Sequence, residues 1–343
     1  MVFFKNRTVK TSFLIGILLS LWLCACNSDK GKNIPDVSHI EVKVKIKRFE
    51  KDLMTIDTNL IKRDMDALVA KYPVFLPDIF FPKILPILQD TTIMKQFLIS
   101  PGIQKLYDTC MVVYNDPVDI EKELESAFRF YKYYFPNKKV PEVISFFSEY
   151  TIGNFTLDDE ILGIGWDFFL GADYPYYDPG FFPNYIKRTM NKEHLVAKSM
   201  EAIATDIVGD AKGERLIDKM ITNGKVLYLL DQFIPNTPDS IKLAYTAVQT
   251  VWCENNEAEL WSYFLVDDLL YSSNMRDIRK LVDYSPFGTS QMPPEAPGRS
   301  ANWMGWQIVK SYMKQNPLTT LDDLIAIKES QTILDKARYK PRR

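Results

Sequence analysis

The side chains that most often carry acid–base or metal chemistry are scarce in this sequence of 343 residues. It contains two histidines, His39 and His194, and four cysteines. Zinc sites are usually built from several His and Cys side chains, so the composition disfavours a metal enzyme of this kind. The glycine-rich nucleotide loops, the GxSxG elbow and the CxxC pair are also missing. The sequence therefore predicts no catalytic residue, no metal site and no cofactor, and hence a protein that is not an enzyme.

One carboxylate, that of Glu201, has flanking residues similar to the catalytic helix of gluzincin-type zinc peptidases. In those enzymes two His at i and i+4 bind zinc, and the Glu between them is the general base. Here Met200 and Ala204 stand at the two His positions, and Glu257 on a later helix stands for the third ligand. The resemblance implies a degenerate gluzincin-like fold whose cleft binds extended peptide without zinc. The alternative is a plain amphipathic helix.

Residues 171–179, which we call the tyrosine loop, contain three Tyr, two Asp and two Pro. Tyrosine offers a large amphipathic contact area at little cost in conformational entropy, so this composition is typical of binding loops. We expect an exposed surface for peptide or sugar, formed by Asp173, Tyr174, Tyr176, Tyr177 and Asp178. Two other interpretations stay open: the tyrosines fold the loop onto the body of the protein, or its two aspartates form a glycosidase pair.

A second candidate binding surface lies near the C-terminus. Arg299 follows a glycine and precedes two tryptophans, Trp303 and Trp306. A guanidinium donates hydrogen bonds in a fork that suits a carboxylate or a backbone carbonyl. We therefore expect Arg299 to hold such a group beside the tryptophans. The alternative is a structural arginine that caps the adjoining helix.

The N-terminal residues have the organisation of an export signal. A basic stretch precedes an apolar run over residues 13–23, which is too short to span a bilayer as a helix. The run ends in Leu-Cys-Ala-Cys, which is similar to a bacterial lipobox. This predicts a signal peptide at residues 1–25, lipid attachment, including palmitate, at Cys26, and a tether at residues 26–38. The alternative is an ordinary secretory signal with a chance cysteine.

The overall charge and the remaining cysteines limit the classes of partner. With 42 basic and 44 acidic residues, the net charge is −2. Nucleic-acid-binding proteins usually carry a clear basic excess, so we expect no nucleic-acid partner. Apart from Cys26, the mature chain contains Cys110 and Cys253. They form either a disulfide or two buried free thiols, and the sequence leaves both alternatives open.

Hydrophobic periodicity predicts a single compact α+β domain over residues 39–343, predominantly helical with a small sheet. Alternating residues 38–48 predict the clearest strand, and two further strands are expected at 140–146 and 161–170. Apolar residues at helical spacing predict several helices. The longest of these are expected at residues 49–71, 118–134, 194–208, 216–230 and 240–270.

Several segments together resemble a known family. They are the lipobox, residues 169–177, 216–238 and 252–257, and residues 297–299 with 303–306. In these segments the sequence resembles the gliding motility lipoprotein GldB family, and the resemblance covers nearly the whole mature chain. It implies a lipid-anchored protein of the cell envelope that is required for surface gliding, works with other proteins of the gliding machinery and has no established enzyme activity.

The sequence thus favours a membrane-anchored, non-enzymatic scaffold or binding component of the gliding machinery. Two alternatives stay open. One is a divergent envelope hydrolase, either a peptidase or a glycosidase. The other is a peptide- or carbohydrate-binding lipoprotein that uses the tyrosine loop. The histidine count separates the zinc peptidase from the favoured function, because a working zinc site normally needs more than one imidazole.

Overall fold

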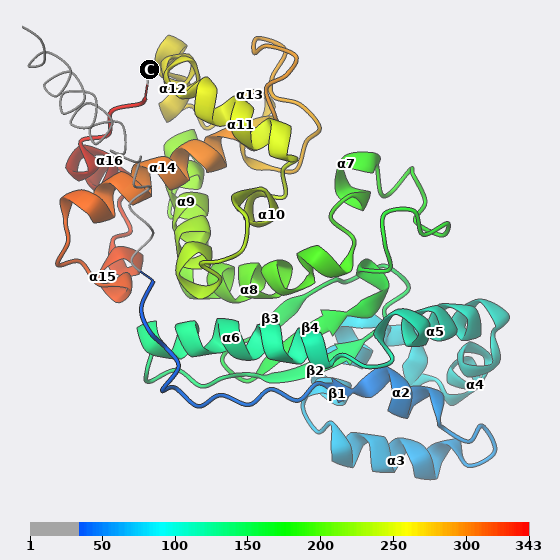
Figure 1. The fold of residues 1–343 in the computed structure, drawn as a ribbon. Helices are drawn as coiled ribbons and strands as arrows, with labels where there is room; N and C mark the ends of the chain where they lie inside the picture. Colours follow the sequence, from blue (N-terminus) through cyan, green and yellow to red (C-terminus); the bar gives the residue numbers. More distant parts are fainter. Residues whose placement is uncertain (1–33, 343) are drawn as a thin grey trace, which may run out of the picture. The chain divides into compact units, whose positions relative to one another are not determined.

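The computed structural model describes residues 34–342, so the predicted signal peptide and Cys26 lie outside the described residues. From Val37 onward the chain forms one compact unit (Figure 1). Helices predominate, and a small mixed sheet lies in the N-terminal half of the chain. The predicted α+β class is therefore confirmed. Within the described residues, no helix combines the length and apolarity that a membrane crossing requires.

The sheet contains β1 (Lys47–Arg48), β2 (Glu142–Phe146), β3 (Phe155–Leu157) and β4 (Ile161–Gly165). Their order across the sheet is β1-β2-β4-β3, with β1, β2 and β4 parallel and β3 antiparallel to β4. Parallel neighbours need a crossover connection, and the long helix α6 (Val118–Tyr134) belongs to the one between β1 and β2. The short strand β3 is the last strand on its side of the sheet.

The chain between β1 and β2 is mainly helical. Its elements are α2 (Phe49–Met54), α3 (Ile61–Lys71), a π-helical stretch (Phe75–Ile84), a 3-10 turn (Pro86–Gln89), α4 (Thr91–Ile99), α5 (Pro101–Tyr114) and α6. After β4 and a 3-10 turn (Trp166–Phe168), helices continue almost to the C-terminus. These are α7 (Asn184–Lys187), α8 (Lys192–Val208), α9 (Leu216–Phe233), α10 (Asp239–Leu243), α11 (Ala247–Asn255), α12 (Glu257–Leu265), a 3-10 segment (Val266–Tyr271), α13 (Met275–Val282), α14 (Ser300–Gln315), α15 (Leu321–Ala326) and α16 (Ser330–Ala337).

The segment before β1 alternates without pairing as a strand. Val44 and Ile46 are buried while the lysines beside them are largely exposed, which confirms the predicted alternation, but only Lys47–Arg48 pairs with β2. The N–H of Val44 donates to the carboxylate of Glu125 at 3.2 Å. The N–H of Ile46 donates to that of Glu121 at 3.0 Å. Because these two carboxylates stand one turn apart on α6, they take the place of a neighbouring strand.

Two long helices expected from periodicity are broken. Residues 49–71 form α2 and α3, and residues 240–270 form α10, α11, α12 and the following 3-10 segment. Helix α10 ends at Leu243, and the next residue, Ala244, has a left-handed φ of 54°. Thr246 then caps α11 by accepting a hydrogen bond from the N–H of Gln249. Periodicity does not register such breaks, because apolar side chains on both sides of the turn still face the core.

Helices α9 and α14 cross with their backbones in contact. A Cβ atom on Gly305 of α14 would lie 1.9 Å from the carbonyl oxygen of Met220 on α9. A Cβ atom on Gly224 of α9 would lie 2.4 Å from the carbonyl carbon of Gly305. Only glycine permits so close an approach. The crossing fixes α14 against the core and thereby positions Arg299, which directly precedes this helix.

Candidate functional site

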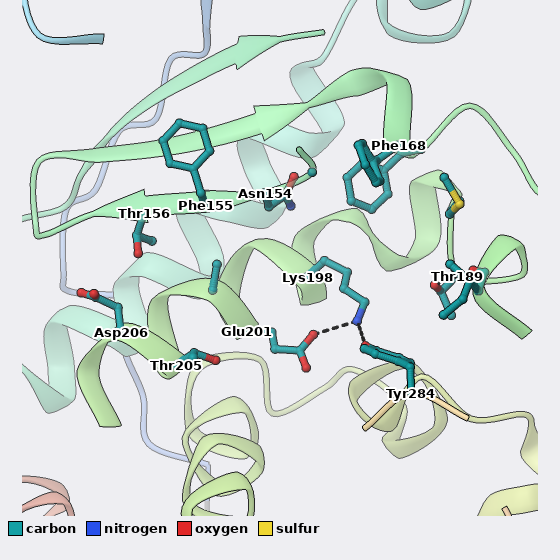
Figure 2. A pocket seen from close by; sticks show the side chains of 15 residues that line it. Asn154, Phe155, Thr156, Phe168, Thr189, Lys198, Glu201, Thr205, Asp206 and Tyr284 are labelled. Carbon is teal, nitrogen blue, oxygen red and sulfur yellow. Dashed lines mark hydrogen bonds and ion pairs between the residues drawn. The ribbon is translucent and has the colours of Figure 1, made fainter. Parts of the chain in front are cut away.

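A cavity of about 640 Å³ lies between the edge strand β3 and helix α8 (Figure 2). Phe168 and Met190 are among the apolar residues that line it, and α8 supplies polar side chains. Asn154, directly before β3, donates from Nδ2 to Oγ of Ser199 on α8 at 2.9 Å. This bond ties the strand to the helix, so that the sheet and α8 form two sides of the cavity.

One face of α8 forms the polar wall of the cavity. The helix begins where the Asn191 side chain accepts a hydrogen bond from the N–H of His194. Lys198, Glu201 and Thr205 follow at intervals of three and four residues, so they share one face, and all three line the cavity. Among the zincin-like positions that the sequence predicted on this helix, Glu201 is the one that lines the cavity.

Met200 and Ala204, the other zincin-like positions on this helix, are fully buried. Neither lines the cavity that Glu201 faces. Compared with the helix face that carries Met200 and Ala204, the face of α8 that borders the cavity is shifted by about one residue along the chain. This shift corresponds to a rotation of roughly 100° about the helix axis. The structure therefore does not bring Met200, Glu201 and Ala204 together at one site.

Glu257, the expected third position, lies at the start of α12 and is 3% exposed. Its carboxylate accepts hydrogen bonds from the hydroxyl of Tyr339 at 2.6 Å and from Nε of Arg342 at 2.8 Å. It does not line the cavity that contains Glu201. In residues 34–342, no group of three or more His, Cys, Asp or Glu side chains is arranged to hold a metal ion.

Glu201 is held between two cations. Lys198 Nζ lies 2.8 Å from Glu201 Oε2, and Arg299 Nη2 lies 3.5 Å from Glu201 Oε1. Lys198 also donates to the hydroxyl of Tyr284 (Figure 2), and the Arg299 guanidinium lies 4.2 Å from the centre of the Tyr284 ring. We call these four residues the ionic cluster. It joins α8 to the loop after α13 and to the start of α14.

The ionic cluster fixes the charge of its members. Burial by itself would raise the pKa of Glu201, but the charges of Lys198 and Arg299 outweigh it, so this pKa lies below its usual range. Burial by itself would lower the pKa of Lys198, but the Glu201 carboxylate and the Tyr284 hydroxyl outweigh it, so this pKa is raised. General acids and bases work best with a pKa near the working pH. Both groups instead stay charged and paired near neutral pH.

A second cavity, of about 480 Å³, adjoins the first at the ionic cluster. The two cavities share Glu201, Thr205 and Tyr284. The second also has Arg299 in its wall and reaches Gly209, just beyond the end of α8. We call the two cavities together the α8 groove. Tyr284 lines both parts.

Arg299 binds the kinds of group that the sequence predicted, but both belong to the protein itself. It pairs with the Glu201 carboxylate and donates from Nη1 to the carbonyl oxygen of Leu243 at 3.3 Å. The predicted binding surface at Trp303 and Trp306 is wrong, since each of these residues is 1% exposed. Trp306 donates from Nε1 to Asp231 at 2.9 Å, so its one polar atom is satisfied within the core.

The tyrosine loop is anchored in the protein by Tyr177, which is 1% exposed. The Tyr177 hydroxyl donates to the carbonyl oxygen of Asp167 at 2.7 Å and accepts from the N–H of Leu170 at 2.9 Å. The Tyr174 ring packs against the Tyr177 ring with centroids 5.0 Å apart. The predicted exposure is therefore wrong for Tyr177, whose ring joins the core because its hydroxyl finds two partners there.

Three other residues of the tyrosine loop lie at the surface. Asp173, Tyr176 and Asp178 are exposed, and none of them lines the α8 groove. Lys105 donates from Nζ to the Tyr176 hydroxyl at 2.6 Å. The Asp178 carboxylate accepts from the N–H of Gly180 at 2.7 Å, a bond that shapes the loop itself. The loop and the groove are thus separate candidate surfaces.

Sequence patterns did not point to Lys198 or Tyr284. Lys198 stands three residues before Glu201, a spacing at which opposite charges pair on a helix, so the sequence did contain a usable signal. Tyr284 lies in the loop after α13, and no periodic pattern predicts where such a loop returns to the body of the protein. Its part in the ionic cluster became visible only with the tertiary structure.

His194 and the two cysteines of the described chain are buried. His194 is 6% exposed, and burial, assisted by the charges of Lys198 and Arg188, lowers its pKa to about 4. Cys110 and Cys253 are free and buried, so the disulfide alternative is not realised. Burial raises the pKa of both thiols, which makes them poor nucleophiles near neutral pH.

A comparison with family models matches nearly the whole chain to one family. The model described as gliding motility protein GldB matches residues 30–341. The chain belongs to the GldB family. It is thus a gliding-motility lipoprotein by family, as the resemblance in its sequence implied. No curated protein and no solved structure matches the chain.

Proposed function

We propose that this GldB-family protein is a non-enzymatic binding component of the gliding machinery, held at a membrane of the cell envelope by lipid on Cys26. Family membership supports the gliding function. The Leu-Cys-Ala-Cys motif after an apolar run supports a signal peptide at residues 1–25 and acylation of Cys26, including palmitate. Residues 26–38 then form the tether. More than one acyl chain gives a stable anchor.

The ionic cluster is the observation that carries the binding role. Glu201 is an acidic group of the α8 groove, and it is already paired with Lys198 and Arg299. Proton transfer through Glu201 would leave two cations facing each other without their counter-charge, which is costly in a half-buried site. A groove with apolar walls and a few fixed polar groups is the usual composition of a ligand site.

The expected ligand is another protein of the gliding machinery. The lipid anchor places the α8 groove within reach of other envelope proteins, and the groove borders both a sheet edge and a helix. A scaffold that works through this groove needs the groove open, whereas a scaffold that works through the tyrosine loop does not.

Filling the groove tests this function. Ala202 is half-buried in the wall of the larger cavity, so Ala202→Trp occupies the space that a ligand would take. We expect cells that carry this variant to lose gliding while the protein stays in the membrane fraction at its normal amount. The matched control is Ala247→Trp, an exposed position on α11 that does not border the groove.

A second variant protects the test from a folding failure. Thr205 is exposed and lines both parts of the groove, so Thr205→Trp obstructs the groove with little change to the core. Normal gliding with both variants, at normal membrane levels, overturns the proposed role of the groove.

The anchor has its own test. Cys26→Ala is expected to move the protein out of the membrane fraction and to abolish acylation of its N-terminus. A Cys26→Ala protein that remains membrane-bound with an acylated N-terminus shows that Cys26 is not the anchor.

A further inference from the structure

We infer that the α8 groove takes an extended polypeptide segment, which adds as a strand to the edge of β3. This inference rests on the proposed function and names the chemistry of the ligand. Its basis is a juxtaposition: an edge strand, an adjoining cavity and a helix face with paired charges border the same space.

β3 has a strand neighbour on one side only. It pairs with β4 through Phe155↔Gly163, Thr156↔Leu162 and Leu157↔Ile161, and the sheet order ends at β3. In an antiparallel pair, alternate residues direct their N–H and C=O groups away from the partner strand. Such an edge is a template for another extended chain. Phe155 and Thr156 line the larger cavity, so the edge borders the space in which a ligand would lie.

The length of the groove suits a short extended segment. Its residues run along α8 from Lys198 to Gly209. At about 1.5 Å per residue, this part of the helix is roughly 16 Å long. An extended chain covers about 3.3 Å per residue, so about five residues of a peptide lie alongside it. The peptide main chain then runs along the free edge of β3 and over the face of α8 that lines the cavity.

The charges of the groove favour a polypeptide main chain with particular side chains. Glu201 is compensated by Lys198 and Arg299, so the middle of the groove offers polar groups without a strong net charge. Figure 2 shows Phe168 and Thr189 at one end of the larger cavity and Thr156 and Asp206 at the other. We therefore expect an apolar side chain at the Phe168 end and a basic one near the exposed carboxylate of Asp206.

Other occupants match these features less well. An acyl chain would fill the apolar end but would leave the backbone groups of the β3 edge without partners. A sugar would meet those groups, but it would lie against the aliphatic and aromatic wall that includes Ile186 and Met190. An extended peptide satisfies the edge with its main chain and the wall with its side chain.

The test uses the full-length lipoprotein in detergent micelles. An array of immobilised linear heptapeptides of random sequence is screened, and the tightest binder is resynthesised with a single N-methyl group at each position in turn. N-methylation removes one N–H donor and keeps the side chain. Because β3 has three residues, strand addition predicts that affinity falls roughly tenfold at one peptide position, or at two positions separated by one residue, and changes little at the others.

Two variants assign the binding to the groove. Ala202→Trp is expected to abolish binding of the selected heptapeptide, and Ala247→Trp to leave it unchanged. Asp206→Lys is expected to weaken binding of peptides with a basic residue, whereas Asp173→Lys, at an exposed position outside the groove, leaves it unchanged.

The outcomes separate this inference from the proposed function. Absence of any heptapeptide that binds, an equal loss of affinity from N-methylation at neighbouring positions, or binding that survives Ala202→Trp overturns the peptide inference. If Ala202→Trp also abolishes gliding, the groove keeps its role with a different ligand. If gliding is normal with Ala202→Trp and with Thr205→Trp, the proposed function fails as well.

Discussion

The tyrosine loop and the α8 groove are built from similar side chains but use them in opposite ways. In the loop, the Tyr177 hydroxyl forms hydrogen bonds with two backbone groups, and its ring is buried in the core. In the groove, Tyr284 is 40% exposed and lines two cavities. An unusual composition therefore marks a segment without telling whether its side chains face the core or the solvent. That distinction depends on which backbone groups need partners.

The largest expected effect is the loss of the Tyr177 side chain. Tyr177→Ala leaves a cavity in the core and should lower the free energy of unfolding by about 3 kcal/mol or more. Tyr177→Phe keeps the ring but leaves the N–H of Leu170 without its partner, which should cost about 1–2 kcal/mol. Chemical denaturation measures both.

The matched control is Tyr176→Ala in the same loop, because Tyr176 is 49% exposed. An exposed substitution of this kind should stay within about 0.5 kcal/mol of the wild type. If Tyr177→Ala is as stable as Tyr176→Ala, the contrast between loop and groove is wrong and the loop is a surface after all.

A smaller effect is expected in the groove. Glu201→Gln removes the charge that separates Lys198 from Arg299, so two cations face each other. The Glu201 side chain is 21% exposed, so water screens part of the repulsion between the two cations. The free energy of unfolding should therefore fall by about 1–2 kcal/mol. Denaturant unfolding of the variant measures it.

Glu214→Gln is the control for this prediction. Glu214 pairs with Lys219, but its side chain is 74% exposed, so its loss should cost less than about 0.5 kcal/mol. Equal effects of Glu201→Gln and Glu214→Gln would mean that the ionic cluster is an ordinary surface pair.

Acid is expected to act on the stability contributions of His194 and Asp167 in opposite directions. Burial and neighbouring cations lower the pKa of His194 on α8 to about 4. Between pH 6.5 and 4 the unfolded chain therefore binds a proton at His194 that the folded chain does not. Because of this difference, the stability of the fold decreases as the pH is lowered through this range. Burial raises the pKa of Asp167, below the tyrosine loop, to about 6. As the pH is lowered, the Asp167 carboxyl takes up its proton in the folded chain before it does so in the unfolded chain. The buried carboxylate therefore destabilises the fold above pH 6, and this cost disappears at low pH.

Single variants separate these two contributions. Relative to the wild type, His194→Gln should gain stability, on the order of 1 kcal/mol, as the pH falls from 7 to 4.5. Asp167→Asn should lose a similar amount over the same range. Thermal unfolding across this pH range decides it, and the same pH dependence for both variants would contradict the assignment.

The sequence predicted the elements better than the direction of their side chains. Residues 118–134 form α6 with the expected bounds, because an amphipathic pattern without breaks leaves one possible core face. The alternating segment before β1 was predicted with the correct buried residues, but the carboxylates of Glu121 and Glu125 replace the expected strand partners. No local pattern indicates such a substitution.

The candidate site was predicted only in part. Glu201 and Arg299 were both singled out, for different reasons, and the structure places them 3.5 Å apart. Their meeting depends on the crossing of α9 and α14 and on the return of the loop that contains Tyr284, which are long-range contacts. Trp303 was misplaced because a helix with small residues at its crossing point, such as Gly305, can bury its large side chains on several sides.

The most direct test of the account compares gliding in cells that carry either a blocked groove or an altered loop surface. One strain carries Ala202→Trp, and the other carries Tyr176→Ala together with Asp178→Ala, both adjusted to the wild-type amount of protein in the membrane fraction. We expect that the first strain does not glide and that the second glides normally. Normal gliding with Ala202→Trp and loss of gliding with the loop variant would contradict it.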